Sequence, residues 1–580
     1  MCPWVYDMVC EVGLRWGSRR AKMLRGQFRN TRDGFTMGSK RVRPAQVATH
    51  RPYLEGVAKN LMEKLYGPDG PPLGTSFADL EQLASQLGKT IAQELLTGSL
   101  DRQSAGAMDP GCPTCGRAGA SAEPEPRVVE TDFGEVLWNE PRCTCTRCRR
   151  SFFPQSRSLG IDRAGLSPAV LTKVVYAGVS CGSFALASEM LATLADLDVS
   201  AKQVERRTRE IGTERCATRD EEVRDYLALP LVERKGVPEG VTAPELAVVQ
   251  VDGGRLQIRD RVGAAVVPEA SPKKKKKGRF WCEDKVGFLA SMKGDTHAVD
   301  PCPQLPDHYL DAGRMSQLVQ EIKANARTRS ESVPAGEASV IPCDTPLSPT
   351  RYEAPELAVR SVVATRQDAH RFGELLATAA WQRGFYGATR RAFLGDGSNA
   401  NWGVWERHFS SFTPIVDFIH ALAYVYQAAM VAGTPAEGWS RYATWIGRLW
   451  SGDAESAIQG MAEFQTTVGM PEATDEETHP RRKLADALGY LRNQQGRMKY
   501  AEYRRAGLPI TTSHVESTIK QINRRVKGTE KFWSEGGAEA ILQLRAEVLS
   551  ETRPLEAYWI DRCRKTTGER RQKATISVSA

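Results

Sequence analysis

Two aspartates in this sequence lie where metal-assisted chemistry would need them, each directly after an apolar segment. Asp252 follows the run LAVVQV, Asp396 follows RRAFLG, and a glycine comes after each acid. Carboxylates brought close together repel each other unless a cation lies between them, and oxygen ligands suit Mg²⁺ or Mn²⁺ better than zinc. A pair of Mg²⁺ ions roughly 4 Å apart can hold the attacking and leaving oxygens of a phosphodiester. The two aspartates therefore predict phosphoryl transfer at a metal site.

A third acid, Glu516, lies on a later amphipathic segment, TTSHVESTIKQINRRVKG (511–528). It borders a stripe of apolar residues at helical spacing: Val515, Ile519, Ile522 and Val526. An isolated acid in such a position is most often a solvated surface residue. A functional role is favoured because the same segment carries four cations that would suit a phosphate backbone: Lys520, Arg524, Arg525 and Lys527.

Cysteines provide a second candidate metal site. Cys112 and Cys115 form one C-x2-C pair, and Cys145 and Cys148 form another. Between them, VVETDFGEVLW has the alternation and the glycine turn of a β-hairpin. Two such pairs predict four thiolates around one structural Zn²⁺. A domain this small buries little apolar surface, so bound zinc would supply much of its folding energy.

One alternative ligand set remains open for the zinc site. Cys143 lies two residues before Cys145 and could replace it. We favour Cys145, because the C-x2-C spacing then matches on both sides. The remaining cysteines have no partner spacing and are expected to be ordinary thiols, among them Cys181, Cys216 and Cys563.

A helix-turn-helix is predicted after the cysteines. The segment from Ser183 to Leu197 has apolar residues at helical spacing: Leu186, Met190, Leu191 and Leu194. Ser200 and Gln203 then form the pattern of a capping box, which starts a second helix with Val204, Thr208 and Ile211 on one face. Basic residues on or near its other face fit recognition of a DNA major groove, whereas a basic solvated helix is the alternative: Lys202, Arg206, Arg207 and Arg209.

The acids require a sheet that brings strand ends together. Apolar runs predict five strands, over 246–254, 284–292, 359–365, 390–397 and 413–418. A helix is expected over 367–383 and another between the last two strands, and this element order is that of an RNase H-like fold. We therefore expect a multidomain α/β protein with an RNase H-like mixed-sheet core. An all-α insertion interrupts the core, and a zinc ribbon and helix-turn-helix precede it.

The positive net charge of the chain suggests that it binds an anionic partner. The 580 residues allow roughly three or four domains, and 79 Lys and Arg against 70 Asp and Glu give a net charge of +9. No apolar N-terminal segment resembles a signal peptide, and no apolar run approaches the roughly 18 residues of a membrane span. We expect a cytoplasmic protein, associated with the nucleoid when it binds DNA. Its 13 cysteines would then stay reduced, which favours metal ligation in the clusters.

The predicted organisation has eight segments. The first is a basic arm, for which a translation start at Met37 instead of Met1 is an equal alternative. A second basic feature, the run Lys273–Lys277, is an exposed loop or a DNA contact. The segments are a basic arm (1–50), a helical segment (51–108), the zinc ribbon (109–155), the helix-turn-helix (160–225), the first core part (245–419), the all-α insertion (420–505), the last core part (506–560) and a basic tail (561–580).

Taken together, these motifs resemble those of ISKra-type insertion-sequence transposases, relatives in architecture of the Mutator-like DDE enzymes. The resemblance covers roughly residues 110–550. It is carried by CPTCGR, CTRCRRSFFP, VSAKQVERR, VQVDGG, WCEDKVGFLASM, FLGDGSNANW, DFIHALAYVY and HVESTIKQINRRVKGTEKFW. Many members have Gly-Ser before the glutamate helix, where this chain has Thr512, Ser513 and His514. The lysine run and the extended N-terminus are also not expected of the family.

The resemblance implies a catalytic triad and a mobile-element function. The acids of VDGG, GDG and VES form the triad in the family, which carries over to Asp252, Asp396 and Glu516. Asp417 and His420 resemble the D-x2-H motif after the fifth strand of Mutator-like enzymes. They are expected to support the site, with a simple helix start as the alternative. The implied activity is that of a bacterial DNA transposase that cuts element ends and joins them to target DNA.

The implied partners are DNA and a second copy of the chain. The DNA comprises the terminal inverted repeats and the target, and a dimer or larger complex is expected because two ends must be paired. Two other functions stay open: a transposase-derived DNA-binding regulator without catalysis, and an RNase H-like nuclease. A G-x4-GK[ST] motif and a serine or tyrosine nucleophile motif do not occur, which gives no support to ATP dependence or to a covalent protein–DNA intermediate.

Overall fold

The computed structural model describes residues 48–104, 111–162, 164–259, 279–327, 353–528 and 531–566. Its contacts divide the chain into two compact units, Met1–Gly88 and Lys89–Ala580. Most of the predicted basic arm, the lysine run and most of the basic tail lie outside the described residues. Within those described, no helix is long and apolar enough to cross a lipid bilayer.

The first unit consists, where described, of helix α3 (Arg51–Tyr66) and the beginning of α4 (Phe77–Ser104). The chain is helical here, as predicted, and none of the α3 residues is buried. Helix α4 continues into the second unit, where Leu96 and Leu100 pack against the following domain. Ile91 and Leu95 of the same helix are exposed at 41% and 65%.

The cysteine-bearing domain is a three-stranded antiparallel sheet. It comprises β1 (Ala120–Thr131), β2 (Gly134–Cys145) and β3 (Arg150–Phe152). The predicted hairpin is confirmed: Thr131 pairs with Gly134 at its turn. Alternate residues point to one face, where Val129, Val136 and Trp138 are buried beneath α4.

Four helices follow: α5 (Pro154–Leu159), α6 (Pro168–Ser180), α7 (Phe184–Ala195) and α8 (Ala201–Ala228). The predicted capping box at the start of α8 is confirmed, with the Ser200 side chain accepting from the Gln203 backbone. Helices α6, α7 and α8 enclose a small core that includes Val174, Leu191 and Val204. Leu194, which was predicted on the apolar face of α7, is 68% exposed.

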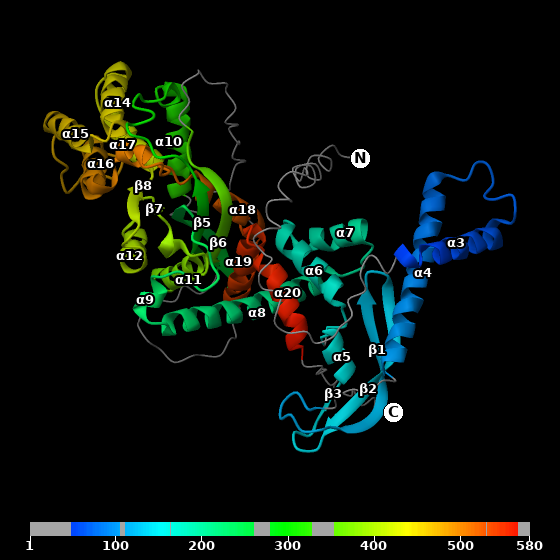
Figure 1. Cartoon of the computed structure of the whole chain (residues 1–580). Coiled ribbons are helices and arrows are strands. Elements are labelled where there is room, and N and C mark those ends of the chain that lie inside the picture. Colours follow the sequence, from blue (N-terminus) through cyan, green and yellow to red (C-terminus); the bar gives the residue numbers. More distant parts are fainter. Residues whose placement is uncertain are drawn as a thin grey trace. The chain divides into compact units, whose positions relative to one another are not determined.

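The central sheet of the second unit has six strands, parallel and antiparallel. These are β4 (Leu246–Arg259), β5 (Arg279–Lys293), β6 (Glu356–Thr365), β7 (Arg390–Gly395), β8 (Thr413–Val416) and β9 (Phe532–Trp533). The order is β6-β5-β4-β7-β8, and β9 pairs with the far half of β4. Strands β4, β5 and β6 pair antiparallel, whereas β4, β7 and β8 run parallel. The five predicted strands all exist, and Figure 1 labels β5, β6, β7 and β8 of this sheet.

Helices cover both faces of this sheet. Helix α11 (Ala369–Gln382) packs against β5, where a side chain at Gly287 would collide with Leu376. On the neighbouring position of β5, Phe288 stacks on His514 of helix α18 (Ser513–Val526). Adjacent residues of a strand point to opposite faces, so α11 and α18 lie on opposite sides of the sheet.

The remaining helices complete the core and its additions. Helix α12 (Asn399–His408) connects β7 to β8, and α19 (Glu535–Leu549) and α20 (Pro554–Lys565) follow β9. Three helices occur where none was predicted. Two are short, α9 (Leu231–Arg234) and η1 (Asp307–Tyr309), and one is long, α10 (Ala312–Arg327). A one-turn helix, η2 (Phe385–Gly387), precedes β7.

The segment between β8 and α18 is entirely helical, as predicted. Figure 1 shows its helices α14 to α17 gathered beside the β8 edge of the sheet. The elements are α13 (Phe418–Ala429), α14 (Pro435–Trp450), α15 (Ala454–Val468), α16 (Pro480–Gln494), η3 (Gln495–Arg497) and α17 (Tyr500–Arg505). We call α13 to α17 the helical insertion.

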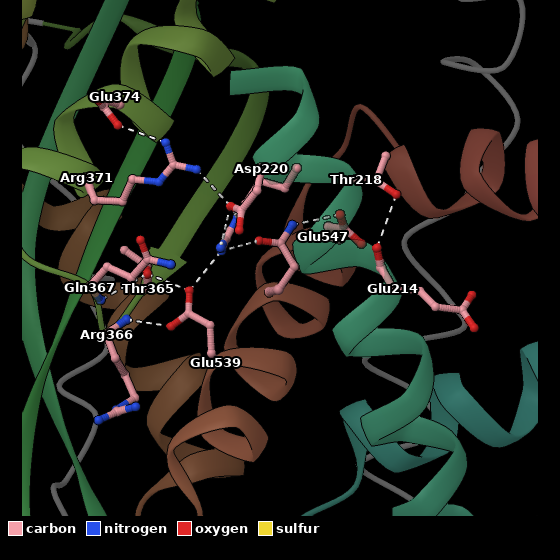
Figure 2. Close-up of polar contacts among 12 residues, drawn as sticks. Glu214, Thr218, Asp220, Thr365, Arg366, Gln367, Arg371, Glu374, Glu539 and Glu547 are labelled. Atoms are coloured by element: carbon pink, nitrogen blue, oxygen red, sulfur yellow. Dashed lines mark hydrogen bonds and ion pairs between the residues drawn. The ribbon is translucent and has the colours of Figure 1, made fainter. Parts of the chain in front are cut away.

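Buried charges join α8 to the central sheet (Figure 2). Arg219 of α8 donates to Glu539 of α19 at 2.9 Å, and Glu539 accepts from the hydroxyl of Thr365, at the end of β6, at 2.6 Å. Farther along, Arg215 pairs with Glu547 at 2.7 Å, and both side chains are buried. Removing one partner of such a buried pair typically costs about 3–5 kcal/mol. The network therefore fixes the long helix α8 against the sheet.

Candidate active site

The parallel strands place three acids at one edge of the sheet. Gln250 of β4 pairs with Leu394 of β7, and continuing this register by two residues places Asp252 opposite Asp396. Strand β8 extends the row, because the pair Gly395–Val416 is followed by Asp396 and Asp417. The backbone N–H of Asp417 donates to the Gly395 carbonyl at 3.0 Å. Asp396 and Asp417 thus directly follow β7 and β8, and Asp252 lies just beyond the last residue of β4 that pairs with β7. The expected strand end at Asp252 is wrong, because β4 continues to Arg259 in its pairing with β5.

The two predicted aspartates are half-buried, and local hydrogen bonds orient them. One carboxylate oxygen of Asp252 accepts from the backbone N–H of Gly253 at 2.7 Å. Oδ1 of Asp396 accepts from the backbone N–H of Ser398 at 3.0 Å and from the Asn401 amide at 2.9 Å. Because Asn401 lies in the first turn of α12, that helix helps to set the direction of the Asp396 carboxylate.

Glu516 reaches the same edge from α18. The first turn of this helix is held by Gln250, which accepts from the Val515 N–H at 3.1 Å and donates to the Thr511 carbonyl at 3.2 Å. The buried Thr512 donates its hydroxyl to Glu516 at 3.2 Å. The glutamate therefore lies on a helix start that is bonded directly to the strand of Asp252.

Asp417 and His420 form a pair beneath these acids. Asp417 is fully buried and caps α13, accepting the backbone N–H of His420 at 2.8 Å and its ring Nδ1 at 2.7 Å. Its other oxygen accepts the backbone N–H of Thr512 at 2.7 Å. Asp417 therefore starts a helix, as one alternative for this motif expected, and it also ties that helix to the start of α18.

The electrostatics of the site reflect concentrated negative charge. Burial raises the pKa of Glu516 to about 7, and the charges of Asp417 and Asp252 add to this effect. Burial alone would lower the pKa of His420. The hydrogen bond to Asp417 and the charges of Asp417, Asp396 and Glu516 outweigh it and raise that pKa to about 9. The imidazolium of His420 thus offsets part of the repulsion among the carboxylates.

The donor set fits a hard cation. Among the described residues outside the cysteine domain, one group has ligand atoms within 4.8 Å of one another: Asp417, His420 and Glu516. Asp252 and Asp396 are not members of that tight group, although both act electrostatically on it. Both oxygens of Asp417 accept backbone N–H groups. Asp252, Asp396 and Glu516 are the other carboxylates near this pair, and carboxylate oxygens are ligands that suit Mg²⁺ or Mn²⁺.

The four predicted zinc ligands come together at the base of the cysteine domain. The Sγ atoms of Cys112, Cys115, Cys145 and Cys148 lie within 4.8 Å of one another, and this cluster could bind zinc. Backbone N–H groups of Cys115 and Thr114 lower the pKa of Cys112 to about 6, which favours its thiolate. Cys143 is buried nearby but does not belong to the cluster. Of the two candidates, only Cys145 therefore has its sulfur within the cluster.

The cations predicted to bind DNA on α8 lie mostly on its surface. Lys202, Arg206 and Arg209 are exposed. Arg207 is half-buried and pairs with Glu210 at 2.6 Å. Three of the four are therefore available to an anionic partner, and the fourth has a protein partner already.

The predicted DNA-binding role of Arg525 is wrong for this structure. Lys520 and Arg524 on α18 are exposed, and Lys527 is half-buried, with its ammonium 5.7 Å from the centre of the Trp281 ring. Arg525, in contrast, is 2% exposed and donates to the Gly178 carbonyl of α6 at 2.9 Å. Its guanidinium lies over two aromatic rings, that of Phe184, which is distant in sequence, and that of Trp533, which lies shortly after α18.

Three residues that support the site were not predicted. Gln250 had a signal, because it is the one polar residue in an otherwise apolar strand up to Asp252. Tyr490 and Gln494 of α16 had none. They contact the loop of Asp396 across about one hundred residues of chain, with the Tyr490 hydroxyl 2.9 Å from the Asp396 carbonyl.

Comparisons with known proteins do not identify a family for this chain. A scan of the chain against protein-family models gives no match. A search among curated proteins likewise finds none that matches it.

Proposed function

We propose that this chain is a DNA transposase of the DDE type, with Asp252, Asp396 and Glu516 as the ligands of its catalytic Mg²⁺ or Mn²⁺. The observation that carries this proposal is the convergence of the three acids at one sheet edge, where Glu516 has a raised pKa. A strongly perturbed carboxyl in a group of acids is typical of a functional site rather than of a solvated surface.

The strand order supports an RNase H-like core. In that fold, three antiparallel strands are followed by two that extend the sheet on the side of the first strand. The order β6-β5-β4-β7-β8, with β4, β7 and β8 parallel, agrees with this arrangement. The helical insertion then separates Glu516 from the two aspartates in sequence and leaves them together in space.

The acids, His420 and the exposed cations of α18 would have different roles in DNA cleavage and joining. The three carboxylates would hold the metal, and bound Mg²⁺ would activate the attacking oxygen and stabilise charge on the phosphate. His420, held by Asp417, would balance the charge of the acids before DNA binds. Lys520 and Arg524 lie on the exposed side of α18 and would contact the phosphate backbone.

The cysteine domain and helices α6 to α8 would select the DNA ends on which the chain acts. The cysteine cluster would hold Zn²⁺ and stabilise a ribbon whose own core is small. Helices α6 to α8 would act as the helix-turn-helix, with Lys202, Arg206 and Arg209 directed to DNA. The buried joint between α8 and α19 would keep the bound DNA in register with the acids.

A strand-transfer assay tests this proposal. The purified chain is incubated with Mg²⁺, a labelled duplex carrying the terminal repeats that flank its gene, and a plasmid target. Labelled ends joined to the plasmid support a transposase. Binding without cleavage would favour a DNA-binding regulator, and cleavage without joining would favour a nuclease.

A further inference from the structure

The helical insertion contacts the loop that carries Asp396 at two points. The hydroxyl of Tyr490 donates to the carbonyl oxygen of Asp396 at 2.9 Å, and the Nε2 amide of Gln494 donates to the carbonyl oxygen of Gly397 at 3.0 Å. Both side chains come from α16, one turn apart. The insertion thus holds two consecutive peptide groups of the loop between β7 and α12.

The loop is shaped to receive Tyr490. Gly397 has a positive φ of 95°, which a residue with a side chain rarely adopts. A Cβ atom at this position would lie 2.6 Å from the Tyr490 ring. The ring also stacks on Tyr424 of α13 with centroids 3.8 Å apart. Tyr490 therefore packs against both the glycine and a second aromatic ring, which restricts the movement of its hydroxyl.

Gln494 is fixed just as closely. Its Oε1 accepts from Arg497 at 2.9 Å, which leaves Nε2 to face the Gly397 carbonyl. Arg497 itself lies over the ring of Trp402 on α12, 4.4 Å from its centre. Helix α12 also carries Asn401, which holds the Asp396 carboxylate. The insertion therefore braces both the backbone of Asp396 and the helix that orients its side chain.

We propose that Tyr490 and Gln494 are positioning residues of the metal site, which act by fixing the backbone of Asp396 and Gly397. The inference rests on the proposed function, because it assigns Asp396 as a metal ligand. Partners that orient a ligand influence metal affinity without touching the metal. The helical insertion is then a part of the active site, as well as a domain beside it.

Mn²⁺ binding to the full chain tests this assignment without any DNA. The free Mn²⁺ in a titration is measured by electron paramagnetic resonance for the wild type, Tyr490→Phe, Gln494→Met and Asp396→Asn. Tyr442→Phe is the matched control, because Tyr442 is a buried tyrosine of the same insertion whose hydroxyl donates to the Tyr309 carbonyl at 2.9 Å, away from the acids. Thermal unfolding of every variant reports the cost to stability.

The expected result separates positioning from stability. Tyr490→Phe and Gln494→Met should each weaken Mn²⁺ binding about tenfold. The Mn²⁺ affinity of Tyr442→Phe, in contrast, should stay within about twofold of that of the wild type. The two Tyr→Phe variants should lose similar thermal stability. If Tyr490→Phe binds Mn²⁺ as tightly as Tyr442→Phe, Tyr490 is not a positioning residue, and the proposed metal site is unaffected. A wild type that binds no more Mn²⁺ than Asp396→Asn would overturn the proposed metal site, and this inference with it.

Discussion

The side chain of Gln250 accepts a hydrogen bond from the backbone N–H of Val515 at 3.1 Å, across 265 residues of sequence. Through this bond the strand that carries Asp252 holds the helix that carries Glu516. The amide also donates to the Thr511 carbonyl, and Gln250 is fully buried. The relative position of the two acids therefore depends on a residue two positions before Asp252 that hydrogen-bonds the start of the Glu516 helix.

Replacing Gln250 by leucine should uncouple the two acids. The change leaves one backbone donor and one acceptor without partners, each worth about 1–3 kcal/mol when buried. We expect the free energy of unfolding to fall by about 2 kcal/mol or more, and Mg²⁺-dependent DNA cleavage to slow by about 100-fold because Glu516 shifts. Urea unfolding and single-turnover cleavage measure the two effects. A variant that cleaves at the wild-type rate would show that the bond does not position Glu516.

Zinc content distinguishes the two candidate cysteines. We expect about one zinc per chain in the wild type, since four thiolates complete a tetrahedral site. Cys145→Ser should lose this zinc, and Cys143→Ser should retain it, because the sulfur of Cys143 is not part of the cluster. Elemental analysis of the dialysed proteins measures the content. Zinc retained in Cys145→Ser but lost in Cys143→Ser would reverse the ligand assignment.

Neighbouring arginines on α18 should behave differently. Arg524 is exposed, so Arg524→Ala should weaken DNA binding and reduce the slope of log affinity against log salt by about one. Arg525 is buried between aromatic rings, so Arg525→Ala should mainly lower the unfolding temperature. Fluorescence anisotropy at several salt concentrations, together with thermal unfolding, compares the two. An equal loss of salt dependence in both variants would contradict the buried role of Arg525.

Metal binding should depend on pH near neutrality. Glu516 has a pKa raised to about 7, first by burial and then by the nearby carboxylates. As the pH falls through this value, the glutamate takes up a proton and ceases to be a metal ligand, so Mg²⁺ affinity should fall. Cleavage at limiting Mg²⁺ should therefore rise between pH 6 and pH 8 as the carboxyl ionises, and high Mg²⁺ should shift the rise to lower pH. A Glu516→Gln variant with the same profile would assign the titration to another group.

Local patterns in the sequence predicted the strands, the capping box and the cluster of four cysteines. The apolar run before Asp252, the Ser200–Gln203 spacing and the two C-x2-C pairs each depend on residues close together in the chain. The apolar run before Asp396 also placed this acid correctly after a strand, whereas β4 continues past Asp252 to Arg259. These features need no knowledge of distant contacts.

Contacts between distant segments could not be predicted in this way. Arg525 adjoins the apolar stripe of α18, and its burial depends on Phe184 and Trp533, which only the folded chain brings beside it. The contact of Tyr490 with the Asp396 loop likewise depends on how the insertion folds back. Helix α10 interrupts the strand region and was not predicted at all.

The most direct measurement of the central claim is the joining of labelled terminal-repeat DNA to a plasmid by the wild type and by Asp396→Asn, with Mg²⁺ present. The variant replaces one carboxylate oxygen by an amide at nearly constant volume. It leaves the cysteine cluster and α8 unchanged, so DNA binding should persist. We expect joined product with the wild type and a loss of at least about 1,000-fold with the variant. Undiminished joining by Asp396→Asn would contradict the role proposed for Asp396.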